Sequence, residues 1–600
     1  MLAALAMPVR SPNNEGTVPD PLSMDWVKIP ADEASDAIIA AMGLGGVDYL
    51  FFTSGSEIAF YQEAIAKAKA HGRKAPRLIT MTHEHAGLNA ALGYAALSGK
   101  PAATAAHVDA GTLNYGGAIH TAWHSGLPVL ITAGAPPASY PGSLRGARDG
   151  GGHIWLQQSY DQNSIVRQYT KWDHRLEFQD NPGLIVSRAL QVALTEPRGP
   201  VYLSLPREVA LLQTSGASFP TVEQLGIPRA VAPNSRDVRE IVERLLGARN
   251  PFVVVSGSGR NPATVKALIE LCELLALPVV DSALPAYHCF PMNHPLYQGC
   301  QSLKEADCIL VLEAKVPWVP GPDAPHPDAY VAVLDVDPIR LSVPTFEFTA
   351  HLRLVADSLL AIRALYESAE GMITAADKDR IAKRAVHWTG RARARRQALE
   401  REALHKSTSV PIDPVWLSYQ VGNILDDNCV VFDESLGRNE TRRYLRCAAP
   451  GSYFHNPGTS GGWSPGAAFG AKLAAPDRDV VAMTGDGFYM FGTANAAIWA
   501  AAHYGAPFMT VVYQNRSYST GTHRVASTYP DSYAAKSGFE GGYFDPPIDF
   551  AREAEAAGAY GENVRDPAEV GPALGRGLEK IRNGTPAVIS VWMSRLLQED

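Results

Sequence analysis

Short apolar runs alternate with longer Ala- and Leu-rich segments along most of the chain. From about Val47, the runs "DYLFFT", "RLITMT", "AATAAH" and "PVLITAG" predict strands, and "AGLNAALGYAALSG" predicts a helix among them. This alternation is typical of βα units that pack on a parallel sheet. The sequence therefore predicts an α/β fold built from doubly wound parallel sheets.

The same pattern begins again near Asn250 with "PFVVVSGSG" and near Pro411 with the strand "CVVFDES". Because 600 residues are too many for a single core, we expect three α/β domains of similar architecture. A charged stretch that includes "TGRARARRQALEREALHK" separates the last two domains, and its interleaved Glu residues favour a solvated helix over a nucleic-acid surface. The expected divisions are an N-terminal arm at 1–34, a first domain at 35–215, a middle domain at 230–368, a charged helical linker at 369–410 and a third domain at 411–600.

Composition narrows the class of protein. The formal net charge is −8, so nothing in the overall balance indicates nucleic acid or an anionic membrane surface as a partner. The six cysteines form no CxxC pair and no cluster with histidines at metal-ligand spacing, which favours a reducing compartment. The opening segment lacks the basic start of a signal peptide, and no apolar run is long enough to span a membrane. We expect a cytoplasmic enzyme that acts on a small molecule and binds neither nucleic acid nor membranes.

One stretch, Val480–Ser519, has the spacing of a binding site. It reads as a strand, "DVVAMT", a helix and a second strand, "PFMTVVYQ", which together make one βαβ unit. Asp486 and Asn515 therefore follow the carboxyl ends of two parallel strands, where open α/β sheets bind ligands. Their oxygens suit Mg²⁺, and Gly485 and Gly487 allow close approach of a phosphate group. A Gly-Asp-Gly turn alone is more often structural, but the strand-helix-strand context favours a metal–diphosphate site.

This arrangement resembles the diphosphate motif of thiamine diphosphate enzymes, a Gly-Asp-Gly followed by Asn after the next strand. The resemblance implies that Asp486, Asn515 and the backbone carbonyl of Ser517 bind Mg²⁺. The family usually has Asn-Asn where this chain has Gln514-Asn515, and commonly Tyr-Gly where it has Tyr518-Ser519. Neither departure removes a metal ligand. By the same resemblance, the third domain would bind the diphosphate and the first domain the pyrimidine of the cofactor.

A second segment, "RLITMTHEHAGLNAALGYAALSGKP", looks like the family segment that supplies a catalytic Glu, and it places Glu84 in that position. The resemblance implies that Glu84 shares a proton with the pyrimidine nitrogen N1′ and so activates the cofactor. A buried carboxyl group with a raised pKa is suited to that exchange. Taken alone, Glu84 would more often be a charge at a helix N-terminus.

The resemblance covers nearly the whole chain and is closest to the branch that contains benzoylformate decarboxylase, with acetolactate synthase as another relative. "HVDAGTLNYGGAIHTAWHSGLPVLITAG" places His107 at an active-site histidine, and "FTSGSE" places Ser56 where the substrate carboxylate binds. "FPMNHPLYQG" places His294 in the segment that supplies a second active-site histidine, although a structural role in that loop is equally expected. Histidines suit proton transfer because they titrate near neutral pH.

Further cofactor contacts are implied by the resemblance alone. One of them departs from the family, because a Gly stands at position 461 where relatives have a bulky apolar side chain that keeps the cofactor bent. Either neighbouring Trp463 replaces that side chain, or the bend is supported differently. The residues implied to contact the cofactor, besides Glu84, Asp486 and Asn515, are Leu436, Gly437, Gly461, Gly462, Trp463, Gly485, Gly487, Phe488 and Tyr518.

The resemblance thus implies an enzyme that uses thiamine diphosphate and Mg²⁺ to cleave or form C–C bonds next to a carbonyl, most simply a 2-oxo acid decarboxylase or carboligase. A 2-hydroxyacyl-CoA lyase, a benzaldehyde lyase-like carboligase, a flavin-dependent oxidase and a catalytically silent cofactor-binding homologue are the alternatives. FAD is possible because some relatives bind it, but "VSGSGRNP" lacks the full glycine fingerprint of a dinucleotide site. Because the family builds its site between subunits, at least a homodimer is implied, and a homotetramer is expected.

Overall fold

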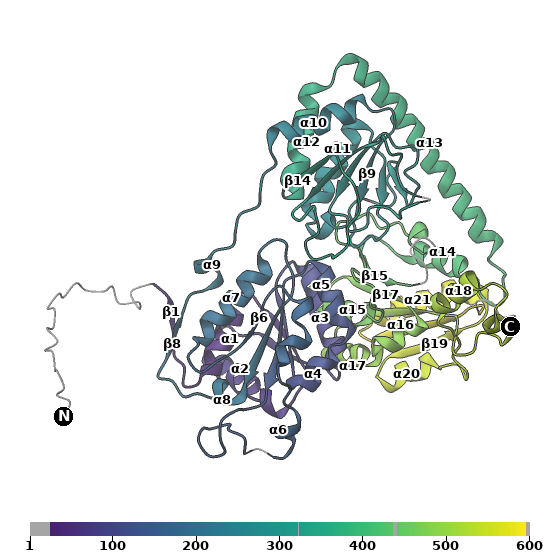
Figure 1. The fold of residues 1–600 in the computed structure, drawn as a ribbon. Coiled ribbons are helices and arrows are strands. Elements are labelled where there is room, and N and C mark those ends of the chain that lie inside the picture. The colour runs from purple at the N-terminus through teal and green to yellow at the C-terminus, as the bar shows by residue number, and fades with distance from the viewer. Residues whose placement is uncertain (1–24, 150, 322, 436–440, 596–600) are drawn as a thin grey trace, which may run out of the picture.

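Three six-stranded sheets, each parallel throughout, organise the molecule (Figure 1). The computed structural model describes residues 25–149, 151–321, 323–435 and 441–595. Helices cover both faces of each sheet, so the predicted doubly wound α/β fold is confirmed. We call the three sheets and their helices the first, middle and third domains; the middle domain lies above the other two in Figure 1.

The first domain has the strand order β3-β2-β4-β5-β7-β6. The runs predicted as strands form β2, β3, β4 and β5, and the Ala-rich run between them forms α3. The strands are β2 (Tyr49–Phe52), β3 (Arg77–Thr80), β4 (Ala102–Ala106), β5 (Val129–Ala135), β6 (Asp173–Arg175) and β7 (Val201–Pro206). The main helices are α1 (Ala34–Leu44), α2 (Phe60–Ala70), α3 (Glu84–Ser98), α4 (Val108–Asn114), α5 (Gly117–Ser125) and α7 (Pro182–Leu194).

The third domain repeats the same topology with the order β16-β15-β17-β18-β20-β19. Its strands β15, β17 and β18 lie side by side, so three carboxyl ends open on one crevice. The strands are β15 (Cys429–Glu434), β16 (Tyr453–His455), β17 (Asp479–Gly485), β18 (Met509–Gln514), β19 (Tyr560–Val564) and β20 (Ala587–Trp592). The main helices are α14 (Pro414–Ile424), α15 (Ser464–Ala474), α16 (Asp486–Phe491), α17 (Ala494–Tyr504), α18 (Ser519–Thr528), α20 (Phe550–Ala556) and α21 (Val570–Arg582).

The middle domain has a different order, β11-β10-β9-β12-β13-β14, in which strands are added outward from β9 in both directions. This is the order of a dinucleotide-binding fold. The strands are β9 (Pro251–Val255), β10 (Val279–Asp281), β11 (Tyr297–Gly299), β12 (Cys308–Leu312), β13 (Tyr330–Asp335) and β14 (Leu352–Val355). The helices are α10 (Ser235–Gly247), α11 (Ala263–Leu275) and α12 (Ser358–Met372).

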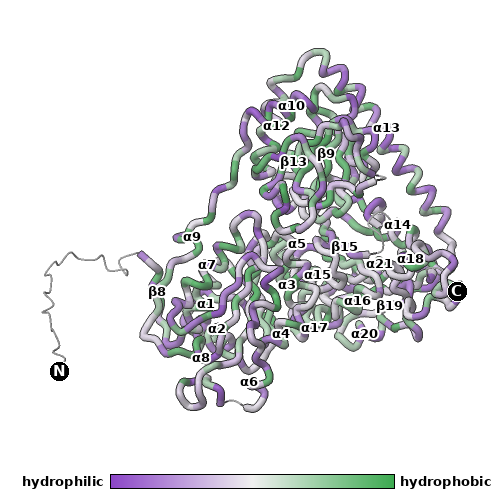
Figure 2. Tube along the Cα trace, in the orientation of Figure 1, coloured by the Kyte–Doolittle hydropathy of each residue, from purple (hydrophilic) through white to green (hydrophobic). Residues whose placement is uncertain are grey.

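The charged stretch after the middle domain forms one long helix, α13 (Ala375–His405), which runs from the middle domain down to α14 (Figure 1). Thr374 and Asp377 form a reciprocal capping box at its start. Figure 2 shows that the helix is mainly hydrophilic, in contrast to the strands. Within the described residues, no helix is long and apolar enough to cross a membrane.

The described chain begins with a short strand, β1 (Val27–Ile29), inside the segment expected to be an arm. It pairs antiparallel with β8 (Ala217–Phe219) at the end of the first domain. The side chain of Lys67 also bonds Asp32 and Asp36, which fixes the segment on the domain. These residues of the expected arm are therefore part of the first domain.

The first and third domains meet where helix α3 packs against helix α15. The helices approach closely because small residues face one another. A Cβ atom placed on Gly93 would lie 1.9 Å from the carbonyl oxygen of Ala467, and one on Gly470 would lie 1.8 Å from that of Ala90. The Ala- and Gly-rich composition of α3 is thus explained by this contact, which fixes Glu84 and its helix against the third domain.

Candidate active site

The crevice at the carboxyl ends of β17 and β18 holds the Gly-Asp-Gly turn. The two strands are parallel neighbours, with Gly485 opposite Tyr513. Asp486 begins α16 directly after β17, and Asn515 follows β18 by one residue. The structure therefore brings the two together at one sheet edge, as the spacing predicts.

Asp486 is 2% exposed, and its carboxylate binds the loop after β18. Oδ2 accepts a hydrogen bond from the backbone N–H of Arg516 at 2.5 Å, and Oδ1 accepts one from Gly487 at 2.8 Å. Burial raises the pKa of Asp486 to about 7, despite the lowering effect of these hydrogen bonds. A divalent cation beside the carboxylate would offset the energetic cost of burying its negative charge, so the site fits a metal ion.

The loop that follows β18 presents oxygen atoms beside Asp486. The side-chain oxygen of Asn515 accepts hydrogen bonds from the N–H and the hydroxyl of Ser517, both at 3.0 Å, which folds the loop into a tight turn. Arg516 has a φ of 58° at this turn. Its guanidinium stacks over Trp592, the last residue of β20, at 4.1 Å and donates a hydrogen bond to the carbonyl of Met593. The turn therefore places amide and carbonyl oxygens near Asp486, while the charge of Arg516 remains close enough to act on the Asp486 carboxylate.

Glycine and aromatic residues form the rest of this crevice. A Cβ atom on Gly485 would meet nothing within 4 Å, which leaves open space beside the turn. A Cβ atom on Gly487 would lie 3.2 Å from the ring of Tyr518. Tyr518 is itself held by Phe491 and Phe544, whose ring centres lie 5.8 and 4.6 Å away. Tyr518 thus covers the Gly-Asp-Gly turn.

The structure shows what occupies the space next to Gly461. A Cβ atom on Gly461 would lie 2.2 Å from the ring of Phe488, so Phe488 fills the position that a side chain at 461 would take. Trp463 is buried and faces Phe432 in the domain core, with ring centres 5.3 Å apart. Of the two explanations left open by the sequence, the packing favours an apolar support other than Trp463.

Gly462 joins this loop to two other elements. Its φ is 91°, and a Cβ atom there would lie 2.3 Å from the backbone nitrogen of Gly492, at the end of α16. Its carbonyl accepts a hydrogen bond from Asn89 on α3 at 3.3 Å. A side chain at 462 would therefore separate α16 from the loop on which the first domain is docked.

Glu434, which sequence reasoning missed, holds the start of α15. It ends β15 and is buried, and its carboxylate accepts hydrogen bonds from the N–H groups of Gly462, Trp463 and Ser464 at 2.8–3.0 Å. Burial raises its pKa, while these hydrogen bonds lower it. The sequence signal was "CVVFDES", an acid at the carboxyl end of a predicted strand. Glu434 fixes the loop that includes Gly461 and Gly462.

Glu84 is the first residue of α3 and is 6% exposed. Its Oε2 accepts a hydrogen bond from the side chain of Asn114 at 3.3 Å. A Cβ atom on Gly111 would lie 3.1 Å from Oε1, so this glycine leaves room for the carboxyl group. Because Asn89 on the same helix bonds Gly462, Glu84 lies at the junction between the first and third domains of this chain.

Ser56 and His107 also come together, around a carboxylate that the sequence did not single out. His107 Nε2 hydrogen-bonds Glu57 Oε2, and the Ser56 hydroxyl donates to the same oxygen at 2.7 Å. The Ser56 hydroxyl lies 3.4 Å from His107 Nε2. Glu57 is 1% exposed; burial alone would raise its pKa, but the bonds from His107 and Ser56 and the charge of Arg207 lower it to about 2. The ionised Glu57 therefore orients both side chains.

His294 lies elsewhere. Its Nε2 is 3.2 Å from Glu273 on α11, its Nδ1 accepts a hydrogen bond from the N–H of Leu296, and its ring packs edge-on against Phe290. All of these partners belong to the middle domain, so within this chain His294 packs in a loop before β11 and is not grouped with Glu84 and His107. Leu436 and Gly437 lie outside the described residues.

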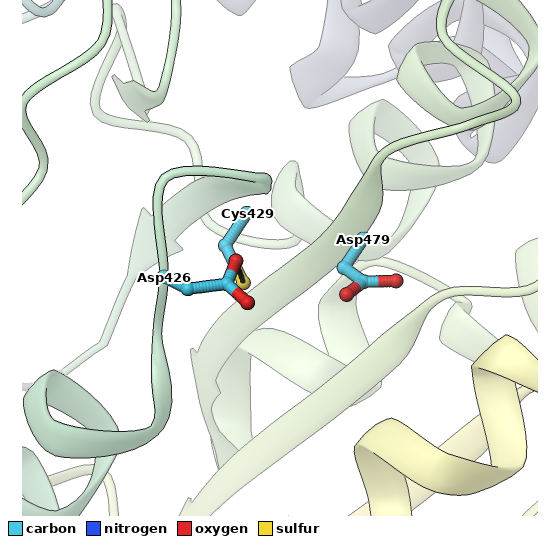
Figure 3. Close-up of side chains that lie close together, drawn as sticks. All are labelled: Asp426, Cys429 and Asp479. Carbon is cyan, nitrogen blue, oxygen red and sulfur yellow. Dashed lines mark hydrogen bonds between the residues drawn. The ribbon is translucent and has the colours of Figure 1, made fainter.

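Another cluster of possible metal ligands lies at the opposite edge of the third sheet (Figure 3). Asp426, Cys429 and Asp479 surround the start of β15 and β17. Arg582 donates to Asp479 at 2.6 Å and to Asp426 at 3.5 Å, which neutralises the acids. Burial raises the pKa of the Cys429 thiol to about 12, so it stays protonated and is a poor metal ligand. The cluster is explained by its ion pairs.

Comparison with known proteins places this geometry in a family. Three family models match: the N-terminal TPP binding domain of thiamine pyrophosphate enzymes at residues 32–165, their central domain at 238–365 and their C-terminal TPP binding domain at 436–591. The chain is 28% identical to benzoylformate decarboxylase of Pseudomonas aeruginosa over 459 residues, 74% of this chain and 79% of the relative. It is 22% identical to a probable acetolactate synthase large subunit of Methanococcus aeolicus over 90% of this chain and 89% of that protein.

Solved structures show the same fold. A thiamine diphosphate-dependent 4-hydroxybenzoylformate decarboxylase of Rhodococcus jostii matches 94% of this chain and all of its own, with a TM-score of 0.74 at 20% identity. Benzoylformate decarboxylase of Polynucleobacter necessarius matches 95% of this chain and all of its own, with the same score at 19% identity. With all three family models matched in order and the fold shared over almost the whole length, the chain belongs to the thiamine pyrophosphate enzyme family.

Proposed function

We propose that the protein is a thiamine diphosphate- and Mg²⁺-dependent enzyme that decarboxylates a 2-oxo acid. The proposal rests on one observation above all: a continuous set of contacts joins Glu84 to Asp486. Helix α3, which begins with Glu84, bonds the loop at Gly462; that loop packs on α16, and α16 begins with Asp486. This supports the proposal that the acid for the pyrimidine and the acid for the metal serve the same kind of site, which the family builds between the first domain of one subunit and the third domain of another.

The residues of the site fit the cofactor by their chemistry. When bound, thiamine diphosphate supplies an electron sink for the bond next to a carbonyl group. Asp486, Asn515 and the carbonyl of Ser517 would hold Mg²⁺, since all three present oxygen atoms. The Gly485–Gly487 turn leaves room for a diphosphate, and Tyr518 covers it. Glu84, buried and bonded by Asn114, would hold a proton at the pyrimidine nitrogen.

On the substrate side, the cluster of Ser56, Glu57 and His107 would bind and orient the acid. On substrate binding the Ser56 hydroxyl would turn from Glu57 and donate to the substrate carboxylate, and the His107 imidazole is suited to moving a proton at the carbon that loses CO₂. Glu57 acts through these two groups by fixing their orientation. The role of His294 stays a prediction: within this chain it contacts Glu273 and Phe290 of the middle domain, the domain from which the resemblance expects the second histidine.

Replacing Glu57 with Gln should lower kcat/KM by about tenfold to 10²-fold, because His107 and Ser56 lose the charge that orients them. Steady-state kinetics on the best 2-oxo acid checks this. Glu63→Gln, a change of an exposed acid on α2, is the matched control and should leave the rate unchanged. Equal rates for wild type and Glu57→Gln would remove Glu57 from the mechanism.

Phe488 should prove to be the apolar support that relatives provide from the position of Gly461. Gly461→Leu places a side chain on the Phe488 ring, and we expect it to lower kcat by about 10²-fold through misplacement of reacting groups. Phe488→Ala should also be impaired, while the double variant Gly461→Leu/Phe488→Ala should recover most of the activity. A double variant no better than either single variant would show that Phe488 does not have this role.

The proposed reaction is tested by CO₂ release from aliphatic, branched and aromatic 2-oxo acids, with thiamine diphosphate and Mg²⁺ present. Aldehyde should appear in equal amount with CO₂ if the enzyme only decarboxylates, and a hydroxyketone should appear if it also joins a second carbonyl. The size of the side chain on the best 2-oxo acid indicates the size of the substrate pocket. Release of CO₂ from none of the acids, with the cofactor bound, would refute the proposal.

A further inference from the structure

A cavity of about 670 Å³ lies between the middle domain, the linking helix α13 and the third domain. In the middle domain it is lined by the end of β10, by β11 and by the segments on both sides of β11. The linking helix α13 and, in the third domain, α14 and the segment at 442–446 line the rest. Cavities of this size hold small organic molecules. Among the described residues, none of those named above for the cofactor, the metal or the substrate lines the cavity.

The lining is strongly cationic in a chain with a net charge of −8. Asp281 and Glu400 are the acids among the described lining residues. Against these two stand five arginines: Arg395, Arg396, Arg442, Arg443 and Arg446. Arginine presents planar N–H groups that match carboxylate and phosphate oxygens, so a surplus of arginines in a cavity favours an anionic ligand.

Arg442 forms the buried end of the cavity. It is 4% exposed, and its Nε and Nη2 donate to Asp281 at 2.7 and 2.8 Å. Its third nitrogen, Nη1, is buried and has no hydrogen-bond partner among the described residues. A buried donor without an acceptor is costly, so this N–H is suited to an acceptor brought by a ligand.

The arginines of α13 show the same surplus of positive charge. Arg395 donates from Nη2 to the carbonyl of Tyr297 at 2.8 Å, while its Nη1 is buried without a hydrogen-bond partner among the described residues. Burial lowers the pKa of Arg396, and the nearby charge of Arg446 lowers it further. An anion bound between Arg396 and Arg446 would offset both the cost of burying the Arg396 charge and its repulsion by Arg446.

We propose that this cavity binds a small organic anion that carries a phosphate or carboxylate group, at a site separate from the cofactor. Arg442 and Arg395 contact the anion at the buried end, and Arg396 and Arg446 contact it nearer the opening. Tyr419 and Tyr444 also line the cavity and provide apolar ring surface for the carbon part of the ligand. Because the lining comes from the middle domain, the third domain and helix α13, the bound anion contacts all three and holds them together.

Isothermal titration of the holoprotein, saturated with thiamine diphosphate and Mg²⁺, tests the site without any turnover. The probes are glycerol 3-phosphate, which has no carboxylate, and glutarate, which has no phosphate, so together they separate phosphate from carboxylate recognition. At low ionic strength at least one should bind with a Kd below about 1 mM. Arg396→Gln/Arg446→Gln should weaken that binding more than about tenfold, since it removes two charged donors. Arg393→Gln, an exposed position on α13 that does not line the cavity, should bind as wild type does.

A measurement on the unchanged protein locates the ligand. Cys300 lines the cavity and is exposed, whereas the other cysteines are buried or partly buried. A saturating probe should slow alkylation of Cys300 by neutral iodoacetamide, followed by mass spectrometry of its peptide. The proposal is overturned if neither probe binds the wild type, if the double variant binds as tightly as wild type, or if a bound probe leaves the alkylation rate of Cys300 unchanged.

Discussion

Asp486→Ala should abolish metal-dependent cofactor binding. The buried carboxylate is the only charged group that we assign to Mg²⁺, and its loss should weaken the binding of thiamine diphosphate by more than about 10²-fold. Titration of the apoprotein with the cofactor, at fixed Mg²⁺, measures the change. The wild-type protein treated with EDTA should behave like the variant, and added Mg²⁺ should restore binding only in the wild type.

Asp531→Ala is a matched control, because Asp531 is an exposed acid of the same domain that lies outside the proposed site. Circular dichroism should show that both variants are folded, since within the described part of the chain the Asp486 carboxylate bonds backbone N–H groups of its own crevice. Cofactor affinity that is the same in wild type and Asp486→Ala would contradict the proposed metal site.

Glu84→Gln should lower kcat by about 10²- to 10⁴-fold and leave cofactor affinity nearly unchanged. The amide keeps the shape of the carboxyl group and its hydrogen bond with Asn114, but its N–H protons are not acidic, so it cannot exchange a proton with the pyrimidine. A lowered kcat with unchanged cofactor affinity distinguishes this variant from Asp486→Ala, in which cofactor binding itself should be weakened. A Glu84→Gln enzyme with wild-type kcat would show that another residue activates the cofactor.

Much of the fold follows from the sequence because buried strands and Ala-rich helices differ in length and composition. The runs at "DVVAMT" and "PFMTVVYQ" form neighbouring parallel strands, β17 and β18. Their register alone places Asp486 and Asn515 together. The short strands β6 ("DHR") and β11 ("YQG") were not predicted, since neither is an apolar run, whereas the equally short β10 lies in the apolar run "PVVDSA".

The side-chain partners could not be predicted, because they depend on packing between distant segments. Phe488 takes the space beside Gly461, and only the approach of α16 to the loop at 461 shows it. Glu57 stands next to Ser56 in the sequence, yet its importance comes from His107, which is fifty positions away. His294 matched a sequence pattern, but its loop is packed against Glu273 and Phe290 within the middle domain.

The most direct test of the account is the exchange of the C2 proton of bound thiamine diphosphate with deuterium, followed by NMR after rapid quenching. The account predicts fast exchange in the Mg²⁺-loaded wild type and exchange slower by about 10²-fold or more in Glu84→Gln with equal cofactor occupancy. That result would place Glu84 and Asp486 in one catalytic site. Equal exchange rates in the two proteins would contradict the central claim that Glu84 activates a cofactor held by Asp486 and Asn515.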